Sequence, residues 1–434
     1  MIPYVEALEL LLDAAPSLDV EEVPLDRALG RLTARPLASP MTQPPFPNSA
    51  MDGYALATGG KELPPGSIWR VAGRVAAGDR PVGEPDPGRG AEGSRVSPGG
   101  KGGVQDGNLP AWEIMTGAPV PPGLDTVIPV EKVEVTAGTE ADPEEIRIPG
   151  AVAPGLNIRP AGKDFQEGDP VLEAGRRIGP VELMGLAALG LDPVPVLQGA
   201  RAAVLCTGPE LVDDPGTRLA PGQIRNSNGP FLAAALEEMG VSVLANRTLE
   251  DREEPFMEEV QKALEGDAHL VVSTGAVSMG RHDFVPRALE RLGARILFHR
   301  AAIRPGKPVL GAVLPGGVLS VGLPGNPIST AAGLRFFVHP VLRRMQGREP
   351  ERPWRMPLLN DFRKPAPLRA FFKARVQVDG EGVPHVRILE GQQSFRIRPL
   401  LESNAWAVLP EGVDEVPAGA MVDVHPLIHA SGWA

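Results

Sequence analysis

Apolar and polar residues alternate with different periods in different parts of the chain, and these periods predict its elements. Apolar positions in residues 5–15 recur at helical spacing, with Glu6 and Glu9 among them, which predicts an amphipathic helix. Residues 23–37 are expected to form an extended segment. From residue 67 to residue 175, short β-type runs are separated by glycine and proline, which indicates a small all-β region.

The middle third of the chain alternates buried-strand patterns with amphipathic helical patterns. Strands are predicted at 201–206, 269–273 and 318–323, and helices at 229–239, 253–266, 284–292 and 326–345. This alternation is typical of βαβ units, so we expect a central three-layer α/β domain with a mostly parallel sheet. After a polar linker at 347–353, short strand patterns return and predict a small C-terminal β domain.

Composition refines this picture mainly by what it excludes. The chain of 434 residues carries a net charge of −11, which argues against a general nucleic-acid binder. One cysteine, Cys206, excludes an intramolecular disulfide and a multi-cysteine metal site, and the seven histidines show no metal-ligand spacing. There is no apolar run of about 18 residues and no basic leader, so neither a membrane span nor a signal peptide is predicted. We therefore expect a cytoplasmic enzyme.

One early segment, "PPFPNSAMDGYAL" at 44–56, suits neither a helix nor a central strand. Its three prolines stiffen the chain, and Asp52 stands in it as a lone carboxylate between small residues. A second unusual stretch at 85–108 is rich in glycine and has almost no apolar residues, which predicts a flexible surface loop.

Three predicted strands of the α/β domain end in polar turns, which should meet at one edge of a parallel sheet. These turns are "CTGPEL" with Glu210, "STGAVSMGRHDF" with Asp283, and "GLPGNPIS" with Asn326. The second turn lets backbone amides approach an anion, and it contributes the candidate binding residues Ser273, Thr274, Gly275 and Ser278. A strand-to-helix connection with capping hydroxyls remains the alternative for this turn.

Basic residues follow these turns in an otherwise apolar segment. Arg300, Arg304 and Lys307 lie within eight residues in "FHRAAIRPGKPVL", which suggests an oxyanion or phosphate subsite in an acidic protein. Glu210 and Asp283 are candidate ligands of Mg²⁺, which takes carboxylates together with phosphate oxygens. Surface charge and helix capping are the alternatives. The residues alone thus predict an α/β enzyme for an anionic ligand and leave the ligand open.

Eight motifs in order make the chain resemble a known family. They are "PPFPNSAMDGYAL", "EIMTGAPVPPGLDTVIP", "GLNIRPAGKDFQEGD", "CTGPEL", "PGQIRNSN", "STGAVSMGRHDF", "RPGKP" and "GLPGNPIST". Together they resemble the molybdopterin molybdenumtransferases of the MoeA type, which are related to the E domain of gephyrin. The resemblance covers nearly the whole chain and is loosest in the C-terminal domain. It implies insertion of molybdate into adenylated molybdopterin with release of AMP, dependent on Mg²⁺, as the last step of molybdenum cofactor synthesis.

The resemblance also implies an arrangement of domains. Residues 1–27 and 140–178 would form an elongated linking domain, 28–139 an inserted β-rich domain, 179–346 the α/β molybdopterin-binding domain and 347–434 a β-barrel-like C-terminal domain. Family members are elongated homodimers whose active site is shared between subunits. The stiffness of 44–56 would then hold Asp52 toward a cleft completed by the other subunit. An Asn-Ser turn with Tyr54 packed behind it is the alternative.

Site residues carry over by position in the motifs. The resemblance implies catalytic roles for Asp52, Thr116, Glu210, Asp251 and Asp283, of which Glu210 and Asp283 would bind the metal. It implies substrate binding by Asp164, Ser273, Thr274, Gly275, Ser278, Arg300, Arg304, Lys307, Arg375 and Ser394, the last two as looser matches in the C-terminal domain.

Departures from the family pattern concern three places. Arg300 and Arg304 stand where relatives frequently have lysine, so the contact geometry to an oxyanion would differ. Ala276 replaces a glycine, so its backbone must avoid positive φ or tolerate strain. The glycine-rich loop at 85–108 is longer than the usual connection. It is either a tolerated insertion or a loop that changes access to the site.

Two other functions remain open. A Mog-type molybdopterin adenylyltransferase shares the central fold, but the N-terminal arm with "SAMDGYA" and the continuation after "GLPGNP" count against it. A Mog-type enzyme is instead expected as a partner. A gephyrin-like scaffold is disfavoured because the chain shows no extra domain or long linker. Neither a preference between molybdate and tungstate nor the rank of the individual acids follows from the sequence.

Overall fold

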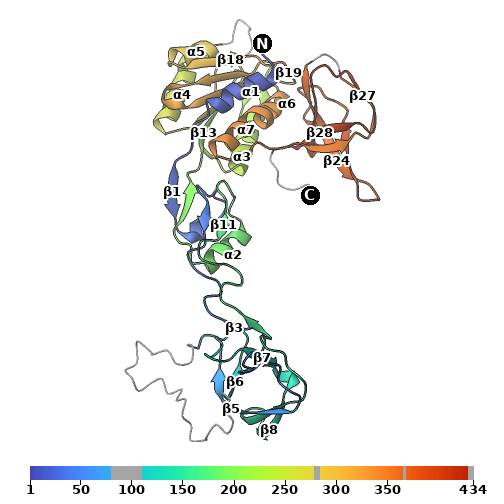
Figure 1. Cartoon of the computed structure of the whole chain (residues 1–434). Helices are drawn as coiled ribbons and strands as arrows, with labels where there is room; N and C mark the ends of the chain where they lie inside the picture. Colours follow the sequence, from blue (N-terminus) through green and yellow to red (C-terminus); the bar gives the residue numbers. More distant parts are fainter. Residues whose placement is uncertain (80–109, 278–283, 365–367, 429–434) are drawn as a thin grey trace. The chain divides into compact units, whose positions relative to one another are not determined.

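The computed structural model describes residues 1–79, 110–277, 284–364 and 368–428 (Figure 1). Two compact units divide the chain. The first comprises Met1–Arg35, Ala174–Pro180 and Pro193–Ala434, and the second comprises Pro36–Glu173 and Val181–Asp192. Each unit is described on its own. No helix in the described part of the chain is long and apolar enough to cross a membrane.

A six-stranded sheet forms the centre of the first unit. Its order is β16 (Ser242–Leu249), β13 (Arg201–Thr207), β17 (Leu270–Thr274), β21 (Leu319–Leu323), β20 (Leu310–Val313) and β18 (Arg295–His299). The first four strands run parallel, which confirms the predicted mostly parallel sheet. The last two pair antiparallel because β18, β20 and β21 follow one another with no α-helix between them, and a parallel pairing needs a long crossover.

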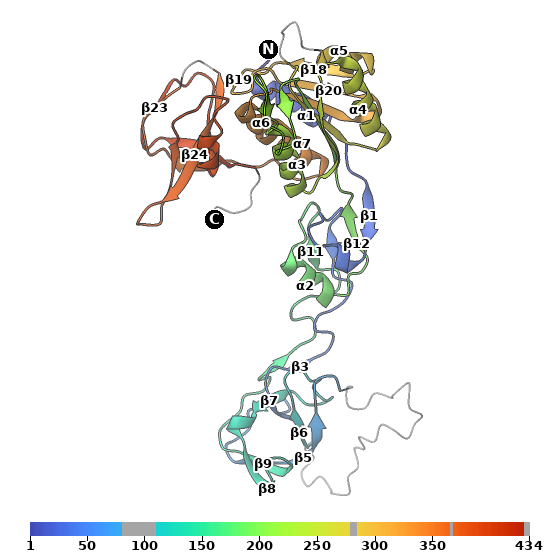
Figure 2. The ribbon, with the colours of Figure 1, turned by 180° about the vertical axis from the view of Figure 1, so that it is seen from behind.

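Helices cover both faces of this sheet and give the predicted three layers (Figure 2). Successive residues of β13 point to opposite faces, so Val204 joins one core and Leu205 the other. Helices α1 (Tyr4–Asp13), α3 (Asn228–Glu238) and α7 (His339–Met345) contribute to the first core, and α4 (Glu253–Glu265) and α5 (Val285–Arg291) contribute to the second.

The helix predicted over 326–345 is confirmed, and its α-helical hydrogen bonding is interrupted by one π-helical turn. It begins at Pro327, as the capping pattern indicated, and runs as α6 (Pro327–Gly333), a π-helical turn (Leu334–Val338) and α7. Pro340 explains the interruption, because it has no N–H to donate to the carbonyl of Phe336 four residues earlier. The hydroxyl of Tyr4 donates to that carbonyl instead, at 3.0 Å. The N-terminal helix thus supplies the hydrogen bond that Pro340 removes.

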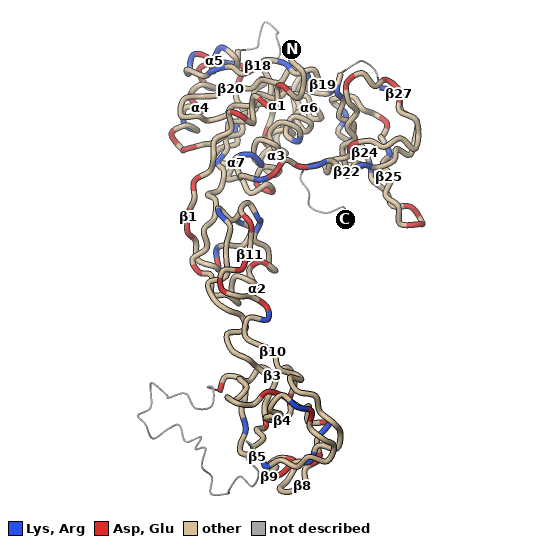
Figure 3. The backbone as a smooth tube through the Cα atoms, viewed as in Figure 1, with Lys and Arg blue, Asp and Glu red and all other residues tan. Residues whose placement is uncertain are grey.

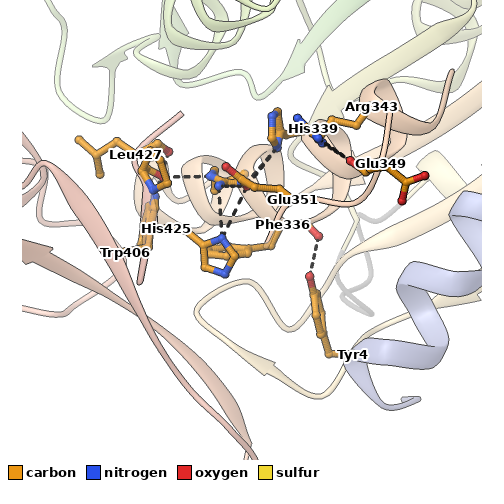
Figure 4. A network of polar contacts seen from close by, with 11 residues as sticks. Tyr4, Phe336, His339, Arg343, Glu349, Glu351, Trp406, His425 and Leu427 are labelled. Carbon is orange, nitrogen blue, oxygen red and sulfur yellow. Dashed lines mark hydrogen bonds and ion pairs between the residues drawn. The ribbon is translucent and has the colours of Figure 1, made fainter. Parts of the chain in front are cut away.

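The π-helical turn also directs a buried arginine toward the C-terminal domain. Arg335 is 2% exposed; its Nε donates to the carbonyl of Pro426 at 2.9 Å, and it forms an ion pair with Glu351. Figure 4 shows Glu351 beside His425, whose Nδ1 lies 3.6 Å from the carboxylate. Nη1 of Arg335 donates to Nδ1 of His339 at 3.0 Å, so that ring nitrogen accepts and His339 is neutral. The guanidinium is therefore neutralised by Glu351 in the linker after α7.

Burial and charge set the protonation of this cluster. Burial opposes ionisation of Glu351, but the ring of His425, with Nδ1 3.6 Å from Oε2, and the charge of Arg335 outweigh it and lower the pKa of Glu351 to about 2. Burial and then the charge of Arg335 lower the pKa of His339 to about 3.

The C-terminal domain is a second sheet within the first unit. Its order is β19 (Ile303–Arg304), β24 (Arg369–Val378), β26 (Ala405–Leu409), β28 (Met421–Pro426) and β22 (Trp354–Pro357), with β25 (Pro384–Ile388) on β24. Strand β19 comes from the α/β segment and pairs in parallel with β24. Closure of these strands into a barrel stays a prediction.

The second unit contains a sheet of short strands, as the β-type runs indicated. Its order is β7 (Thr126–Pro129), β4 (Gly53–Leu56), β6 (Ala111–Ile114), β5 (Ser67–Val75), β9 (Pro143–Ile148) and β8 (Glu134–Gly138). Helix α2 (Pro180–Ala188) was not anticipated from the sequence. The glycine-rich stretch at 85–108 lies outside the described residues.

The predicted domain boundaries stay predictions, although two elements pack across them. Helix α1, assigned to the linking domain, places Tyr4 and Leu11 in the core of the α/β layers. Strand β9 was also assigned to the linking domain, but it pairs with β5 and β8 of the inserted sheet.

A double-mutant cycle tests the interrupted helix. Tyr4→Phe should destabilise the protein by about 1–3 kcal/mol, because the buried carbonyl of Phe336 loses its donor. In a Pro340→Ala background, a backbone N–H is present at residue 340, so the same change should cost less than about 1 kcal/mol. Urea unfolding monitored by circular dichroism measures both costs. Equal costs in the two backgrounds would contradict this account.

Acid should destabilise the protein in two overlapping steps. The folded-state pKa values of His339 and Glu351 lie below their ordinary values of 6.5 and 4.5, so the unfolded chain takes up protons first. Stability at neutral pH should be lost between about pH 6.5 and 3 through His339, and between about pH 4.5 and 2 through Glu351. Thermal unfolding against pH measures this loss. His339→Gln should remove the upper step, whereas Glu415→Gln, in an exposed ion pair, should change nothing.

Candidate active site

The segment 44–56 is built into the second unit by short strands. β3 (Asn48–Ser49) pairs antiparallel with β10 (Ile158–Arg159), and β4 pairs with both β6 and β7. Gly53 is required at its position, because a Cβ there would lie 1.9 Å from the carbonyl oxygen of Ile128. The segment is therefore held on both sides and does not form an isolated loop.

Asp52 lies at the surface and is oriented by Thr116. Its Oδ1 accepts hydrogen bonds from the backbone N–H of Thr116 at 2.6 Å and from the Thr116 hydroxyl at 2.8 Å. These two bonds, the backbone one first, lower the pKa of the carboxyl group, so Asp52 is ionised at neutral pH. Oδ2 accepts no hydrogen bond from the described residues. The two motifs that contain Asp52 and Thr116 thus present one oriented carboxylate oxygen.

The third motif, at 155–169, lies beside the same segment. The N–H of Ala50 donates to the carbonyl of Asn157 at 2.8 Å, and the N–H of Asp164 donates to the carbonyl of Gln43 at 3.0 Å. Asp164 is exposed. Backbone hydrogen bonds therefore bring three segments that are far apart in the sequence, with Asp52, Thr116 and Asp164, into one region of the second unit.

In the first unit, the three polar turns meet at the carboxyl edge of the central sheet. The N–H of Gly275 donates to the carbonyl of Leu323 at 3.2 Å, and the hydroxyl of Thr207 donates to the carbonyl of Thr274 at 3.3 Å. The amide Nδ2 of Asn228 donates to the carbonyl of Gly325 at 2.7 Å. Gly275 has a φ of +89°, and a Cβ there would lie 2.4 Å from the carbonyl oxygen of Thr207. Only glycine fits this close approach.

The acids at this edge are exposed. Glu210 follows β13 and its carboxylate packs against Gly208, where a Cβ would lie 2.7 Å from Oε2. Asp251 follows β16, whose last residue, Leu249, accepts a hydrogen bond from the N–H of Gly208. Asp283 and Ser278 lie outside the described residues. Of the two predicted metal ligands, Glu210 and Asp283, the structure therefore describes Glu210. Within the described ranges, no group of three or more His, Cys, Asp or Glu residues is arranged to hold a metal ion.

Ser273 and Thr274 are buried rather than open to solvent. Ser273 is 0% exposed, and its hydroxyl finds no hydrogen-bond partner among the described residues. A Cβ at Gly322 would lie 3.5 Å from this hydroxyl and 2.7 Å from Val277. Substrate contact by these two side chains stays a prediction, whereas Gly275 and Ala276, the next two residues, are half-buried.

The basic segment forms a closed bend beside the sheet. The N–H of Arg300 donates to the carbonyl of Val309 at 2.7 Å, and the N–H of Ala301 donates to that of Lys307 at 3.2 Å. Arg304 and Lys307 are exposed and Arg300 is half-buried. None of the three cations forms an ion pair with a described residue. Acidic and basic residues are otherwise mixed along the described backbone (Figure 3).

The C-terminal domain brings Ser394 to this edge but not Arg375. The carbonyl of Ser394 accepts a hydrogen bond at 3.0 Å from the N–H of Ile328, in the first turn of α6. Arg375 is exposed and pairs across β24 and β25 with Arg387. Lys373, two residues earlier, is 0% exposed and donates to the carbonyls of Gly391, Gln393 and Arg396. Burial, and then the charge of Arg396, lower the pKa of Lys373 to about 8.

Three family models match consecutive parts of the chain. They describe the MoeA N-terminal region (domain I and II) at residues 2–190, a probable molybdopterin binding domain at 203–344, and the MoeA C-terminal region (domain IV) at 355–427. The molybdopterin molybdenumtransferase of Synechococcus elongatus is 37% identical over 98% of this chain and 100% of its own length. The chain belongs to the MoeA family.

Other relatives support this membership over the whole length. The molybdopterin molybdenumtransferase 2 of Mycobacterium tuberculosis is 34% identical over 93% of this chain and 94% of its own length. The crystal structure of the molybdopterin biosynthesis MoeA protein from Pyrococcus horikosii superposes with a TM-score of 0.79 at 28% identity, with 100% of both chains covered. The full-length fold of this MoeA family member is therefore that of solved MoeA structures.

Two further groups of polar residues in this MoeA family member were not singled out from the sequence. Arg159 and Lys163 are exposed cations in the motif that ends with Asp164, and neither forms an ion pair with a described residue. In the first unit, Oδ1 of Asp213 accepts from Nδ2 of Asn226 at 3.0 Å and from the hydroxyl of Thr248 at 2.8 Å. The motif "GLNIRPAGKD" contains these cations but was used only for Asp164, and the motif "PGQIRNSN" contains Asn226 but contributed no predicted site residue.

Proposed function

We propose that this chain is a molybdopterin molybdenumtransferase, which inserts molybdate into adenylated molybdopterin and releases AMP. The observation that carries this proposal is the full-length match to curated proteins of that name, at 37% identity over 98% of the chain in one case. The convergence of three polar turns at the sheet edge supports it, because such an edge binds anionic ligands in open α/β sheets.

The proposed reaction breaks a phosphoanhydride bond, for which positioning and charge neutralisation supply most of the catalysis. Arg300, Arg304 and Lys307 would hold the anionic oxygens, since they lie together and have no acidic partner among the described residues. Glu210 and Asp283 would hold Mg²⁺, which neutralises phosphate charge when bound. Carboxylate oxygens suit this ion, and Glu210 is exposed at the sheet edge.

Asp52 would act from the second unit as an ionised, oriented acceptor. Its lowered pKa keeps the carboxylate charged, and Thr116 fixes its direction through two hydrogen bonds. Such a group suits the binding of the pterin or of the attacking oxygen. Asp164, with Arg159 and Lys163 nearby in the sequence, would line the same region.

We further propose a homodimer in which each active site is shared between subunits. Helix α2 supports an apolar contact with a second copy, because Val181 is 72% exposed and Met184 is 69% exposed, while only Leu186 of this helix is buried. A Mog-type adenylyltransferase as supplier of substrate and a cytoplasmic location stay predictions.

The assay of AMP release tests the proposed activity. The purified protein is mixed with adenylated molybdopterin, Mg²⁺ and molybdate, and AMP is followed by chromatography. AMP should appear only with molybdate, and removal of Mg²⁺ with a chelator should abolish its release. Formation of the adenylate from ATP and molybdopterin would instead identify an adenylyltransferase.

Subunit complementation tests the shared site. Asp52→Ala and Glu210→Ala should each reduce AMP release about tenfold or more, because each removes a charge-assisted interaction worth about 1.5–3 kcal/mol. The two variants are unfolded together and refolded as a mixture. About a quarter of the sites should then be intact if each site combines residues of two subunits of a dimer. Activity no higher than that of the separate variants would rule out sharing.

A further inference from the structure

Two residues with side chains adopt left-handed backbone conformations at the carboxyl edge of the sheet. Ala276 has a φ of +48° and Arg300 a φ of +82°, a region that L-residues other than glycine rarely occupy. Such conformations persist only where the surroundings impose them, and they gather at functional sites. Ala276 stands where a glycine is expected from the family motif, and the structure shows that its backbone keeps the conformation typical of glycine.

One side chain links the two strained segments. Nε2 of His299, the residue before Arg300, lies 2.7 Å from the carbonyl oxygen of Val277, the residue after Ala276. A carbonyl oxygen only accepts, so Nε2 carries the proton and donates it. At its other end the turn is fixed by the hydrogen bond from the N–H of Gly275 to Leu323. The turn at 275–277 is therefore held from both sides.

The same turn contains backbone hydrogen-bond donors that have no acceptor among the described residues. The backbone N–H groups of Ala276 and Val277 donate to no carbonyl among the described residues, whereas most buried or half-buried amides are paired. Successive N–H groups near a left-handed residue form a concave site for an anion. On the other side of the linking bond, the N–H of Arg300 is bound to Val309 and its carbonyl accepts from Ile2, so its backbone is fixed as well.

We propose that His299 is a positioning residue. It holds the turn at 275–277 in its strained conformation and keeps it next to Arg300, so that the N–H groups of Ala276 and Val277, which have no acceptor among the described residues, and the guanidinium receive the same anionic group of the substrate. This inference rests on the proposed function. It differs from a purely structural role of His299, in which the hydrogen bond would stabilise the end of β18 and leave substrate binding unaffected.

Variants of His299 separate the two roles. His299→Leu removes the donor, and His299→Gln places an amide donor close to the position of Nε2. His269→Leu is the matched control, because Nδ1 of His269 accepts a backbone hydrogen bond from Arg201 at the opposite, amino end of the same sheet. We expect His299→Leu to raise the KM for adenylated molybdopterin and the Kd for AMP about tenfold. His299→Gln should restore both to within about twofold, and His269→Leu should leave both unchanged.

Relief of the strain gives a second test. Ala276→Gly allows the turn to adopt positive φ without cost, so the turn depends less on His299. In the His299→Leu background, Ala276→Gly should therefore recover part of the lost AMP affinity, measured by calorimetry. If His299→Leu does not fold, His299→Asn replaces it, because its amide is too short to reach Val277.

The outcomes distinguish this inference from the proposed function. If the wild-type protein releases no AMP in the presence of molybdate, the proposed function fails. If the wild type is active and His299→Leu keeps the wild-type KM and AMP affinity, the positioning role is wrong. A lower melting temperature in His299→Leu with unchanged KM and AMP affinity would likewise overturn it and leave only the structural role.

Discussion

The close approach of Gly275 to Thr207 is the constraint on which the candidate site in the first unit depends. A Cβ at residue 275 would lie 2.4 Å from the carbonyl oxygen of Thr207, so only a glycine allows the second turn to lie against the first. The N–H of Gly275 also donates to the carbonyl of Leu323, which ties the second turn to the third. The side-chain amide of Asn228 donates to the carbonyl of Gly325 in that third turn. Because the strands carrying these turns are parallel and adjacent, one sheet edge collects polar groups from three distant parts of the chain.

The second unit also places a polar group at its surface, but it does so with short strands rather than with the edge of a parallel sheet. Its strands are short, and prolines and backbone hydrogen bonds hold the segment around Asp52 in place. Gly53 permits β4 to lie against Ile128, and this contact leaves the preceding residue, Asp52, at the surface. Thr116 then donates two hydrogen bonds to Oδ1 of Asp52 and so fixes the orientation of its carboxylate. Part of this segment forms the central strand β4, which its composition did not predict, because Gly53 permits the close pairing with β7; the residues before β4 orient a charged side chain.

A polar core connects the α/β layers with the C-terminal sheet inside the first unit. Pro340 interrupts the last long helix, Tyr4 satisfies the carbonyl that is set free, and the resulting π-helical turn carries Arg335 to Glu351 and Pro426. The ring of Phe336, in the same turn, stacks on Phe371 of β24 with 3.9 Å between ring centroids. The C-terminal domain thereby keeps Ser394 at the first turn of α6. Substitutions in this core would act on the site without touching a substrate.

The sequence alone predicted the fold class, the alternation of strands and helices in the α/β domain, the family and the three polar turns. Local periodicity, glycine and proline patterns and motif order carry that information, since each depends on neighbouring residues. Only the tertiary structure showed features that depend on contacts between residues far apart in the sequence, namely hydrogen-bond partners and the burial of side chains. The helix over 326–345 was predicted without its π-helical turn, for which Pro340 is the local signal; only the tertiary structure shows that Tyr4, more than 300 residues away, donates to the freed carbonyl. Likewise, the sequence predicted that the hydroxyl of Ser273 belongs to the site, but this side chain is buried. His299 was read only as a strand residue, but its side chain contacts the carbonyl of Val277. Both results depend on how the strands and turns pack, which local sequence does not specify.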